Sequence, residues 1–308
     1  MNACIRAAVR TAIYHGIEVY GIRKGYNGMI KGDLYRMESS SVSNTIQKGG
    51  TILKSARSEE FLTKEGREKA YNQLKKFEID GLVAIGGNGT FTGATLFYEE
   101  FGIPIVGAPG TIDNDLYGTD YTIGYDTAVN TALDAIDKIR DTADSHERVF
   151  FVEVMGRDSG YIAMPCAIGG GAEIVMIPET VTSINQVIDT LRNGWDRSKT
   201  SFIIVVAEGD EEGNATDIAA QVKEALPQMD ARVTILGHVQ RGGSPTAADR
   251  LLASQIGIAT VEGLMNGKKD VMAGIVDSKL VYTPFKDTIH KKKIINQRFM
   301  HMVEILSV

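Results

Sequence analysis

Six short apolar runs, rich in valine and isoleucine, recur along the chain at 81–87, 103–110, 148–156, 172–179, 201–209 and 232–238. Their apolar residues are continuous rather than alternating, which is typical of strands buried on both faces, as in parallel sheets. Amphipathic segments of helical length lie between them, among them 125–145, 183–198 and 247–267. Strands that alternate with helices predict an open α/β fold.

The length and charge of the chain limit the classes of protein to which it can belong. Its 308 residues are enough for about two domains. The net charge of −6 does not indicate a basic surface that would attract nucleic acid or an anionic membrane. No apolar stretch reaches the ~18 residues that span a bilayer, and the first residues lack a secretory pattern. We expect a cytoplasmic protein that binds neither nucleic acid nor membrane, in which Cys4 and Cys166 are packing residues.

Most of the apolar runs end in polar turns that contain glycine, and in open α/β sheets ligands bind at these carboxyl ends. The turn GGNGT contains Gly86, Gly87 and Gly89 and precedes a helix that we expect to begin near Thr92. Such a turn favours a phosphate group, although a tight turn without a ligand explains it equally well. It is neither a GxGxxG fingerprint nor a P-loop, so the commonest dinucleotide and NTP sites are absent.

The segment PGTIDND follows the run at 103–110 and carries a hydroxyl and two carboxylates. Thr111 could orient a substrate, Asp113 could accept a proton and Asp115 could help to hold a cation. Taken alone, an Asx-turn that satisfies its own backbone explains the segment better.

Basic residues near the ends of other runs favour a ligand. They are Arg57, Arg148, Arg157, Arg232, His238 and Arg241. Singly, each arginine is better explained by a surface ion pair, and His238 by a satisfied core histidine. Placed at one sheet edge with the carboxylates, they predict a site for a phosphorylated metabolite. The tract at 287–298 is interpreted as the top of a solvated helix that binds nothing.

The segments GGNGT, PGTIDND, EVMGRDSGYIA, AEG and LGHVQRGGSP resemble, in order and spacing, those of the ATP-dependent 6-phosphofructokinases. The resemblance extends from residue 1 through 236–250. It implies an α/β fold of two doubly wound (Rossmann-like) lobes, a homotetramer, and magnesium-dependent transfer of the ATP γ-phosphoryl group to the C1 hydroxyl of fructose 6-phosphate. We expect the nucleotide-binding lobe at 1–124 with 240–290, and the sugar-phosphate-binding lobe at 125–239 with 291–308.

The resemblance also implies a role for individual residues. Asp113 would accept the C1 hydroxyl proton, assisted by Thr111 and Arg157, with Asp115 and Asn88 near the metal. The implied ATP-binding residues are Arg57, Ser58, Gly87, Asn88, Gly89 and Thr90. The implied sugar-phosphate contacts are Thr111, Ile112, Asp113, Met155, Gly156, Arg157, Glu208, His238, Val239, Gln240 and Arg241. Arg148 and Arg232 correspond to arginines that reach in from a neighbouring subunit, so the active sites would be shared.

A regulatory anion site of the family corresponds to a further set of residues: Arg6, Arg10, Arg140, Glu173, Arg197 and Lys199. One more arginine of that site is Ser39 here, which leaves effector control open.

Three features bear on whether the chain is active and which donor it uses. Neutral Asn88 replaces the carboxylate of the usual GGDGS, which weakens the metal site. Gly89 and Gly110 are typical of ATP users, whereas pyrophosphate users have Asp and Lys there. Family members begin with an apolar strand and a GGDAPG loop that precede the point where Met1 lies, so we expect a misplaced start codon or a trimmed chain. The alternatives are pyrophosphate as donor, a non-catalytic effector-binding paralogue, and a related kinase of NAD or lipid.

Overall fold

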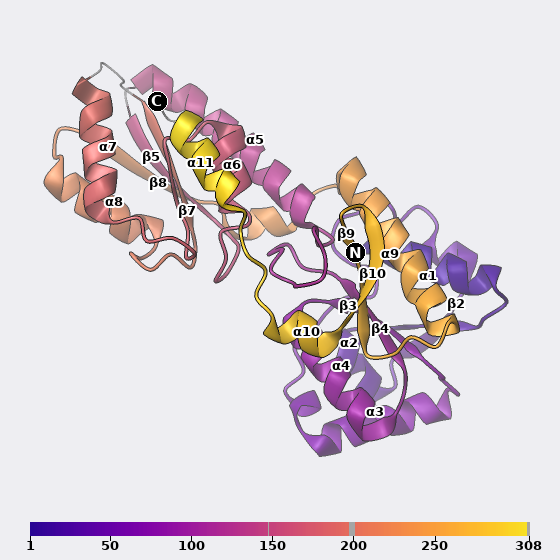
Figure 1. Cartoon of the computed structure of the whole chain (residues 1–308). Helices are drawn as coiled ribbons and strands as arrows, with labels where there is room; N and C mark the ends of the chain where they lie inside the picture. Colours follow the sequence, from indigo (N-terminus) through magenta and orange to yellow (C-terminus); the bar gives the residue numbers. More distant parts are fainter. Residues whose placement is uncertain (147, 197–200, 307–308) are drawn as a thin grey trace. The chain divides into compact units, whose positions relative to one another are not determined.

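The computed structural model describes residues 1–146, 148–196 and 201–306 of the chain. These residues form two compact units (Figure 1). The first unit contains Met1–Thr111, Leu116–Asp126 and Gly243–Lys292, and the second contains Ile112–Asp115, Thr127–Gly242 and Lys293–Val308. The chain therefore crosses between the units several times, once within the TIDND segment and once directly after it.

The first unit is built on a four-stranded sheet with the order β10-β9-β4-β3. Its strands are β3 (Leu82–Gly86), β4 (Ile105–Pro109), β9 (Val271–Val276) and β10 (Lys279–Pro284). The first three are parallel, and β10 returns antiparallel to β9. A separate antiparallel hairpin joins β1 (Val19–Ile22) to β2 (Leu34–Met37). Parallel strands with both faces covered explain why the apolar runs are continuous.

Helices cover both faces of this sheet (Figure 1). One layer contains α2 (Gly25–Lys31), α3 (Lys64–Lys76), α4 (Asn88–Phe101) and α10 (Phe285–His290), and the other contains α1 (Asn2–Tyr14) and α9 (Ala247–Met265). The short 3-10 helices η1 (Ser39–Val42) and η2 (Glu60–Leu62) lie in the connection between β2 and α3. On β4, Gly107 leaves room for the stacked rings of Phe91 and Phe285, because a Cβ there would lie 2.5 Å from Phe91 and 2.6 Å from Phe285.

The second unit is built on a parallel sheet with the order β6-β7-β5-β8. Its strands are β5 (Arg148–Val154), β6 (Ile174–Met176), β7 (Phe202–Ala207) and β8 (Asp230–Ile235). In Figure 1, α7 (Ile184–Asp196) and α8 (Ala215–Ala225) cover one face, and α5 (Tyr125–His146), α6 (Ala163–Gly170) and α11 (Gln297–Leu306) lie on the other. The α/β fold expected from the sequence is confirmed. In the described part of the chain, no helix is both long and apolar enough to cross a membrane.

The run predicted as a strand at 232–238 differs from the structure. The strand β8 lies at Asp230–Ile235, and residues Gly237–Arg241 form the 3-10 helix η3 instead. The strand β8, at one edge of its sheet, is exposed or half-buried rather than buried on both faces; Ile235, for example, is exposed. An apolar run alone does not distinguish an edge strand from a central one.

Two expectations about helices are wrong. The helix after GGNGT begins at Asn88 rather than near Thr92, with Gly87 as its N-cap, so the turn residues form its first turn. The tract at 287–298 is not one helix, because α10 ends at His290 and α11 begins at Gln297. The helix predicted at 183–198 is α7, and its last two predicted positions lie outside the described residues.

Candidate active site

The phosphate-loop candidate of the first unit is the junction of β3 and α4. Asn88, Gly89 and Thr90 lie in the first turn of α4, where the N-terminus of a helix presents backbone N–H groups and a partial positive charge. Gly89 is exposed, and a Cβ added to it would meet no atom within 4 Å. Packing does not require glycine there, so the open space above the helix N-terminus can receive a ligand.

Tyr26 of α2 holds this first turn in place, a role that no sequence pattern indicated. Its hydroxyl donates to the Thr90 carbonyl at 2.6 Å, and its ring stacks on Phe61 with 3.9 Å between centroids. Burial raises the pKa of the Tyr26 hydroxyl, which keeps it a neutral donor.

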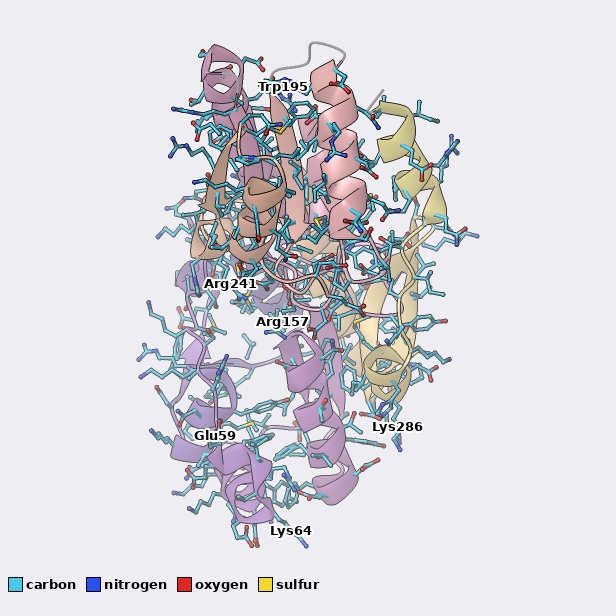
Figure 2. The ribbon with its side chains drawn as sticks, turned by 90° about the vertical axis from the view of Figure 1, so that its left-hand side faces the viewer. Glu59, Lys64, Arg157, Trp195, Arg241 and Lys286 are labelled. Carbon is cyan, nitrogen blue, oxygen red and sulfur yellow. The ribbon has the colours of Figure 1, made fainter. Side chains whose placement is uncertain are left out.

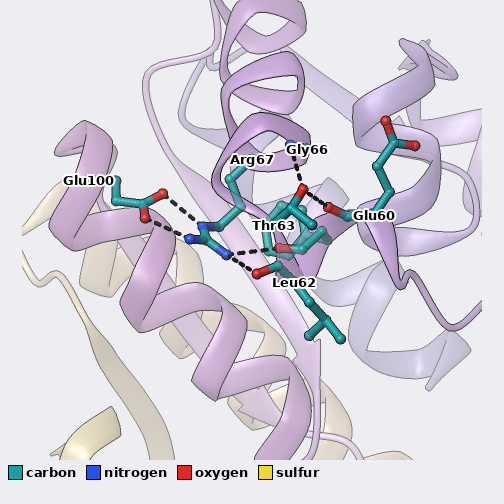
Figure 3. A network of polar contacts seen from close by, with 7 residues as sticks. Glu60, Leu62, Thr63, Gly66, Arg67 and Glu100 are labelled. Atoms are coloured by element: carbon teal, nitrogen blue, oxygen red, sulfur yellow. Dashed lines mark hydrogen bonds and ion pairs between the residues drawn. The ribbon is translucent and has the colours of Figure 1, made fainter.

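The segment that carries Arg57 and Ser58 is an irregular connection with Arg57 exposed, and it leads into η2. The end of this connection is anchored by Arg67 of α3, another residue that the sequence did not reveal (Figure 3). The Arg67 guanidinium donates to the carbonyls of Phe61 at 3.1 Å and Leu62 at 2.8 Å. It also forms two bonds of 2.7 Å with the carboxylate of Glu100 on α4. The Arg67 and Glu100 pair thus ties η2 to the helix that begins at the phosphate loop.

The TIDND segment carries the candidate base. Asp113 is buried, and its Oδ2 lies 3.3 Å from Nε of Arg157, whose side chain is 62% exposed. The Ser159 hydroxyl donates to the Asp113 carbonyl at 3.2 Å. Asn114, the next residue, has a left-handed φ of 54°, which asparagine tolerates better than most residues. A buried carboxylate beside an exposed guanidinium is suited to accept a proton from an anionic substrate.

Asp115 is the candidate metal ligand. Burial raises its pKa, and the neighbouring Asp113 carboxylate raises it further. In the described residues no group of three or more His, Cys, Asp or Glu side chains could hold a metal ion alone. Mg²⁺ commonly binds through one or two carboxylates together with water and phosphate oxygens. A cation would relieve the repulsion between the two acids, so this pair fits a magnesium ion that arrives with a phosphate ligand.

The loop after β5, at 155–157, is held in shape by Glu208, which follows β7. The Glu208 carboxylate accepts from the backbone N–H of Arg157 at 2.8 Å and of Gly156 at 3.3 Å. Met155 is buried, and its N–H donates to the Gln240 side chain at 2.8 Å. The Arg157 side chain on this loop, labelled in Figure 2, is largely exposed.

The candidate sugar-phosphate contacts that follow β8 lie on η3. His238, Val239 and Arg241 are exposed, whereas Gln240 is buried beneath them. His238 taken alone was expected to be a core histidine, and this is wrong because η3 follows an edge strand and lies at the surface. The exposed His238 and Arg241 are available to an anion (Figure 2 labels Arg241).

Arg148 and Arg232 do not share the sheet edge with these residues, which corrects the sequence expectation. Arg148 opens β5, so it lies at the amino end of the strand that leads to Arg157 at its carboxyl end. Both arginines bind Asp230, with Arg148 Nε 2.8 Å from Oδ2 and Arg232 Nε 3.0 Å from Oδ1. These hydrogen bonds lower the pKa of Asp230, and the bond from Arg148 has the larger effect.

The candidate effector residues belong to different parts of the chain. Arg6 and Arg10 lie on α1 of the first unit, and Arg140 and Glu173 lie in the second. Arg140 donates to the carbonyls of Gly170 and Gly171 at 2.6 Å each, at the end of α6. The candidates Arg197 and Lys199 lie outside the described residues.

The fold and these residues define a class of two-unit α/β protein with loops suited to phosphate ligands. A family model described as phosphofructokinase matches residues 1–264. The chain is 67% identical to an ATP-dependent 6-phosphofructokinase of Cytophaga hutchinsonii, covering 100% of this chain and 94% of the relative. It is 55% identical to ATP-dependent 6-phosphofructokinase 1 of Thermus thermophilus, covering 100% of this chain and 95% of that one. The chain belongs to the phosphofructokinase family.

Solved structures agree on the fold. The structure of phosphofructokinase from Saccharomyces cerevisiae matches with a TM-score of 0.90 and 31% identity over 100% of this chain, which spans 45% of the yeast chain. A pyrophosphate-dependent phosphofructokinase from Marinobacter aquaeolei matches with a TM-score of 0.83 and 24% identity, over 96% of this chain and 82% of that one. The second likeness concerns the fold alone.

Proposed function

We propose that this chain transfers the γ-phosphoryl group of ATP to the C1 hydroxyl of fructose 6-phosphate, giving fructose 1,6-bisphosphate and ADP in glycolysis. The observation that carries the proposal is the buried Asp113 carboxylate 3.3 Å from the exposed Arg157. The ATP-dependent relatives that share 67% and 55% of its residues support the same donor and acceptor.

Asp113 is the base in this proposal. Phosphoryl transfer passes through a loose transition state, so positioning and charge stabilisation provide most of the catalysis. As the C1 oxygen attacks the γ-phosphorus, its proton passes to the Asp113 carboxylate, and the bond to the ADP oxygen breaks. Arg157 orients that carboxylate and offsets negative charge near the transferring group.

The two units have separate tasks in the proposal. The first unit holds ATP through Arg57, Ser58 and the first turn of α4, while Thr111 and Ile112 adjoin the base. The second unit holds the sugar phosphate through the loop at 155–157, Glu208 and η3. Asp115 of the second unit would hold a magnesium ion, which would neutralise phosphate charge, and Asn88 of the first unit is proposed as a weaker, neutral metal ligand.

The positions of Arg148 and Arg232 support active sites shared within an oligomer, for which we propose a homotetramer. Arg148 is the first of the seven residues of β5, so at the usual rise of a strand it lies about 20 Å from the loop at 155–157. One small sugar phosphate cannot contact both ends of this strand in one subunit. In the proposal these arginines therefore serve the site of a neighbouring copy. We also propose that the enzyme acts in the cytoplasm.

A coupled assay of the purified protein with fructose 6-phosphate, MgCl₂ and either ATP or pyrophosphate tests the proposal. We expect turnover with ATP and little with pyrophosphate. Turnover with pyrophosphate alone would overturn the donor. Turnover with neither, together with retained binding of fructose 6-phosphate in calorimetry, would favour a non-catalytic paralogue.

A further inference from the structure

Lys293 lies in the irregular tract between α10 and α11, beyond the residues that the family model matches. Its Nζ donates to the Asn114 carbonyl at 3.2 Å. It also lies over the ring of Tyr161, 4.9 Å from the centroid. Lys293 and both partners belong to the second unit, and Lys293 is half-buried whereas its neighbour Lys292 is exposed.

The first contact acts on the segment that carries the proposed base. Asn114 separates Asp113 from Asp115 and adopts a left-handed backbone with a φ of 54°. That conformation is unfavourable for a residue with a side chain. A hydrogen bond from an ammonium group is stronger than one from a neutral donor. Lys293 therefore stabilises the backbone turn that sets the directions of the two carboxylates.

The second contact joins this turn to the loop that follows β5. Tyr161 follows Gly160, whose N–H donates to both oxygens of Glu179 at 3.0 Å. Ser159 of the same loop donates to the Asp113 carbonyl. A cation over the face of an aromatic ring is attracted by the ring's quadrupole. Lys293 thus contacts both loops, and its positive charge also acts on the Asp115 carboxylate.

We propose that Lys293 is a positioning residue for phosphoryl transfer, which holds the Asp113–Asp115 turn against the loop at 155–161. The proposal rests on the proposed function above. Because Lys293 contacts Asn114 and Tyr161 and not the residues at 155–157 that bind the sugar phosphate in the proposal, its loss affects turnover more than substrate binding.

The test compares Lys293→Met, Lys293→Arg and the matched control Lys292→Met in the full chain. We expect Lys293→Met to lower kcat by about 10- to 100-fold, the range that misplacement of a reacting group produces. The KM values for ATP and fructose 6-phosphate should stay within about threefold of the parent. Lys293→Arg, which keeps the charge and a donor, should recover most of kcat, and Lys292→Met should match the parent.

Amide hydrogen exchange gives a readout that does not depend on activity. We expect faster exchange at 112–116 in Lys293→Met but not in Lys292→Met, with an unchanged thermal midpoint. Unchanged kcat and exchange in Lys293→Met would overturn the proposal, as would a kcat loss that Lys293→Arg does not restore and that accompanies a lower midpoint. An inactive parent would overturn the proposed function alone, because the exchange measurement would still decide the role of Lys293.

Discussion

At the scale of single residues, Asp113 combines burial with a charged partner. Its carboxylate is almost inaccessible to solvent and lies beside the guanidinium of Arg157. We expect Asp113→Ser to lower kcat by about 10²- to 10⁴-fold, the usual contribution of a positioned general base. The KM for fructose 6-phosphate should change little, because most of the proposed sugar-phosphate contacts come from other loops and remain in place. Steady-state kinetics of the parent and the variant provide the measurement.

Asp189→Ser is the control for that substitution, since Asp189 is an exposed carboxylate on α7 in the same unit. It should leave both constants unchanged. If Asp113→Ser retained activity within a few-fold of the parent, Asp113 would not be the base.

At the scale of elements, a substitution in the first turn of α4 is expected to affect nucleotide binding without lowering stability. Gly89→Asp places a carboxylate in open space at the N-terminus of the helix, where a negative charge stabilises the helix by about 0.3–1 kcal/mol. We expect the thermal midpoint not to fall, while repulsion of the ATP phosphates raises the KM for ATP by about tenfold, the equivalent of ~1.4 kcal/mol.

Gly89→Ala distinguishes charge from size in that experiment. It should keep the KM for ATP close to the parent value. An equal rise in both variants would mean that the backbone at Gly89 is too close to the nucleotide for any side chain.

The Arg67 and Glu100 pair makes the stability of the first unit depend on pH. The hydrogen bonds from Arg67 lower the pKa of Glu100, so the stabilisation is complete above the unfolded value of about 4.3 and is lost as the pH falls through the lower folded value. We expect Glu100→Gln to reduce the free energy of unfolding at pH 7 by about 1–3 kcal/mol. The difference in the free energy of unfolding between the parent and Glu100→Gln should become smaller as the pH falls below about 4.

Circular dichroism during denaturation is the suitable probe for this prediction, because the single tryptophan, Trp195, lies in the second unit. The control is Glu99→Gln on the same helix as Glu100, which removes an exposed ion pair with Lys286 of α10. It should change the free energy of unfolding by about 1 kcal/mol or less. A pH-independent difference for Glu100→Gln would contradict the linkage.

At the scale of the whole molecule, the arginines at the amino end of the second sheet are the test of oligomeric function. We expect Arg232→Ala and Asp113→Ser to be poorly active when each is purified alone. Mixed oligomers formed by co-expression should recover activity, because some sites then combine an intact Asp113 with an intact Arg232 from the neighbouring copy. The specific activity of the mixed and unmixed preparations is the measurement.

A mixture no more active than its components, with mixed oligomers verified by mass spectrometry, would show that each subunit uses its own Arg232. In that case Arg148 and Arg232 would have only their structural role around Asp230.

The fold class and much of the candidate site could be predicted from the amino-acid sequence alone. Continuous apolar runs predicted β3 to β7, since strands buried on both faces require them. The conjunction of GGNGT, PGTIDND and the later loops identified the family, and the chain's relatives bear this out. Asp113 and Arg157, 44 positions apart, were predicted to act together, and the structure brings them into contact.

Only the tertiary structure decided which basic residues meet the carboxylates. Arg148 was grouped with residues at the carboxyl ends of strands although it begins the predicted run at 148–156, and the structure places it at the amino end of β5. Nor does sequence order show that Lys293, in a tract that resembles solvated helix, contacts a turn 179 residues earlier. Tyr26 and Arg67 were missed because both donate to backbone carbonyls, and any residue type supplies a carbonyl.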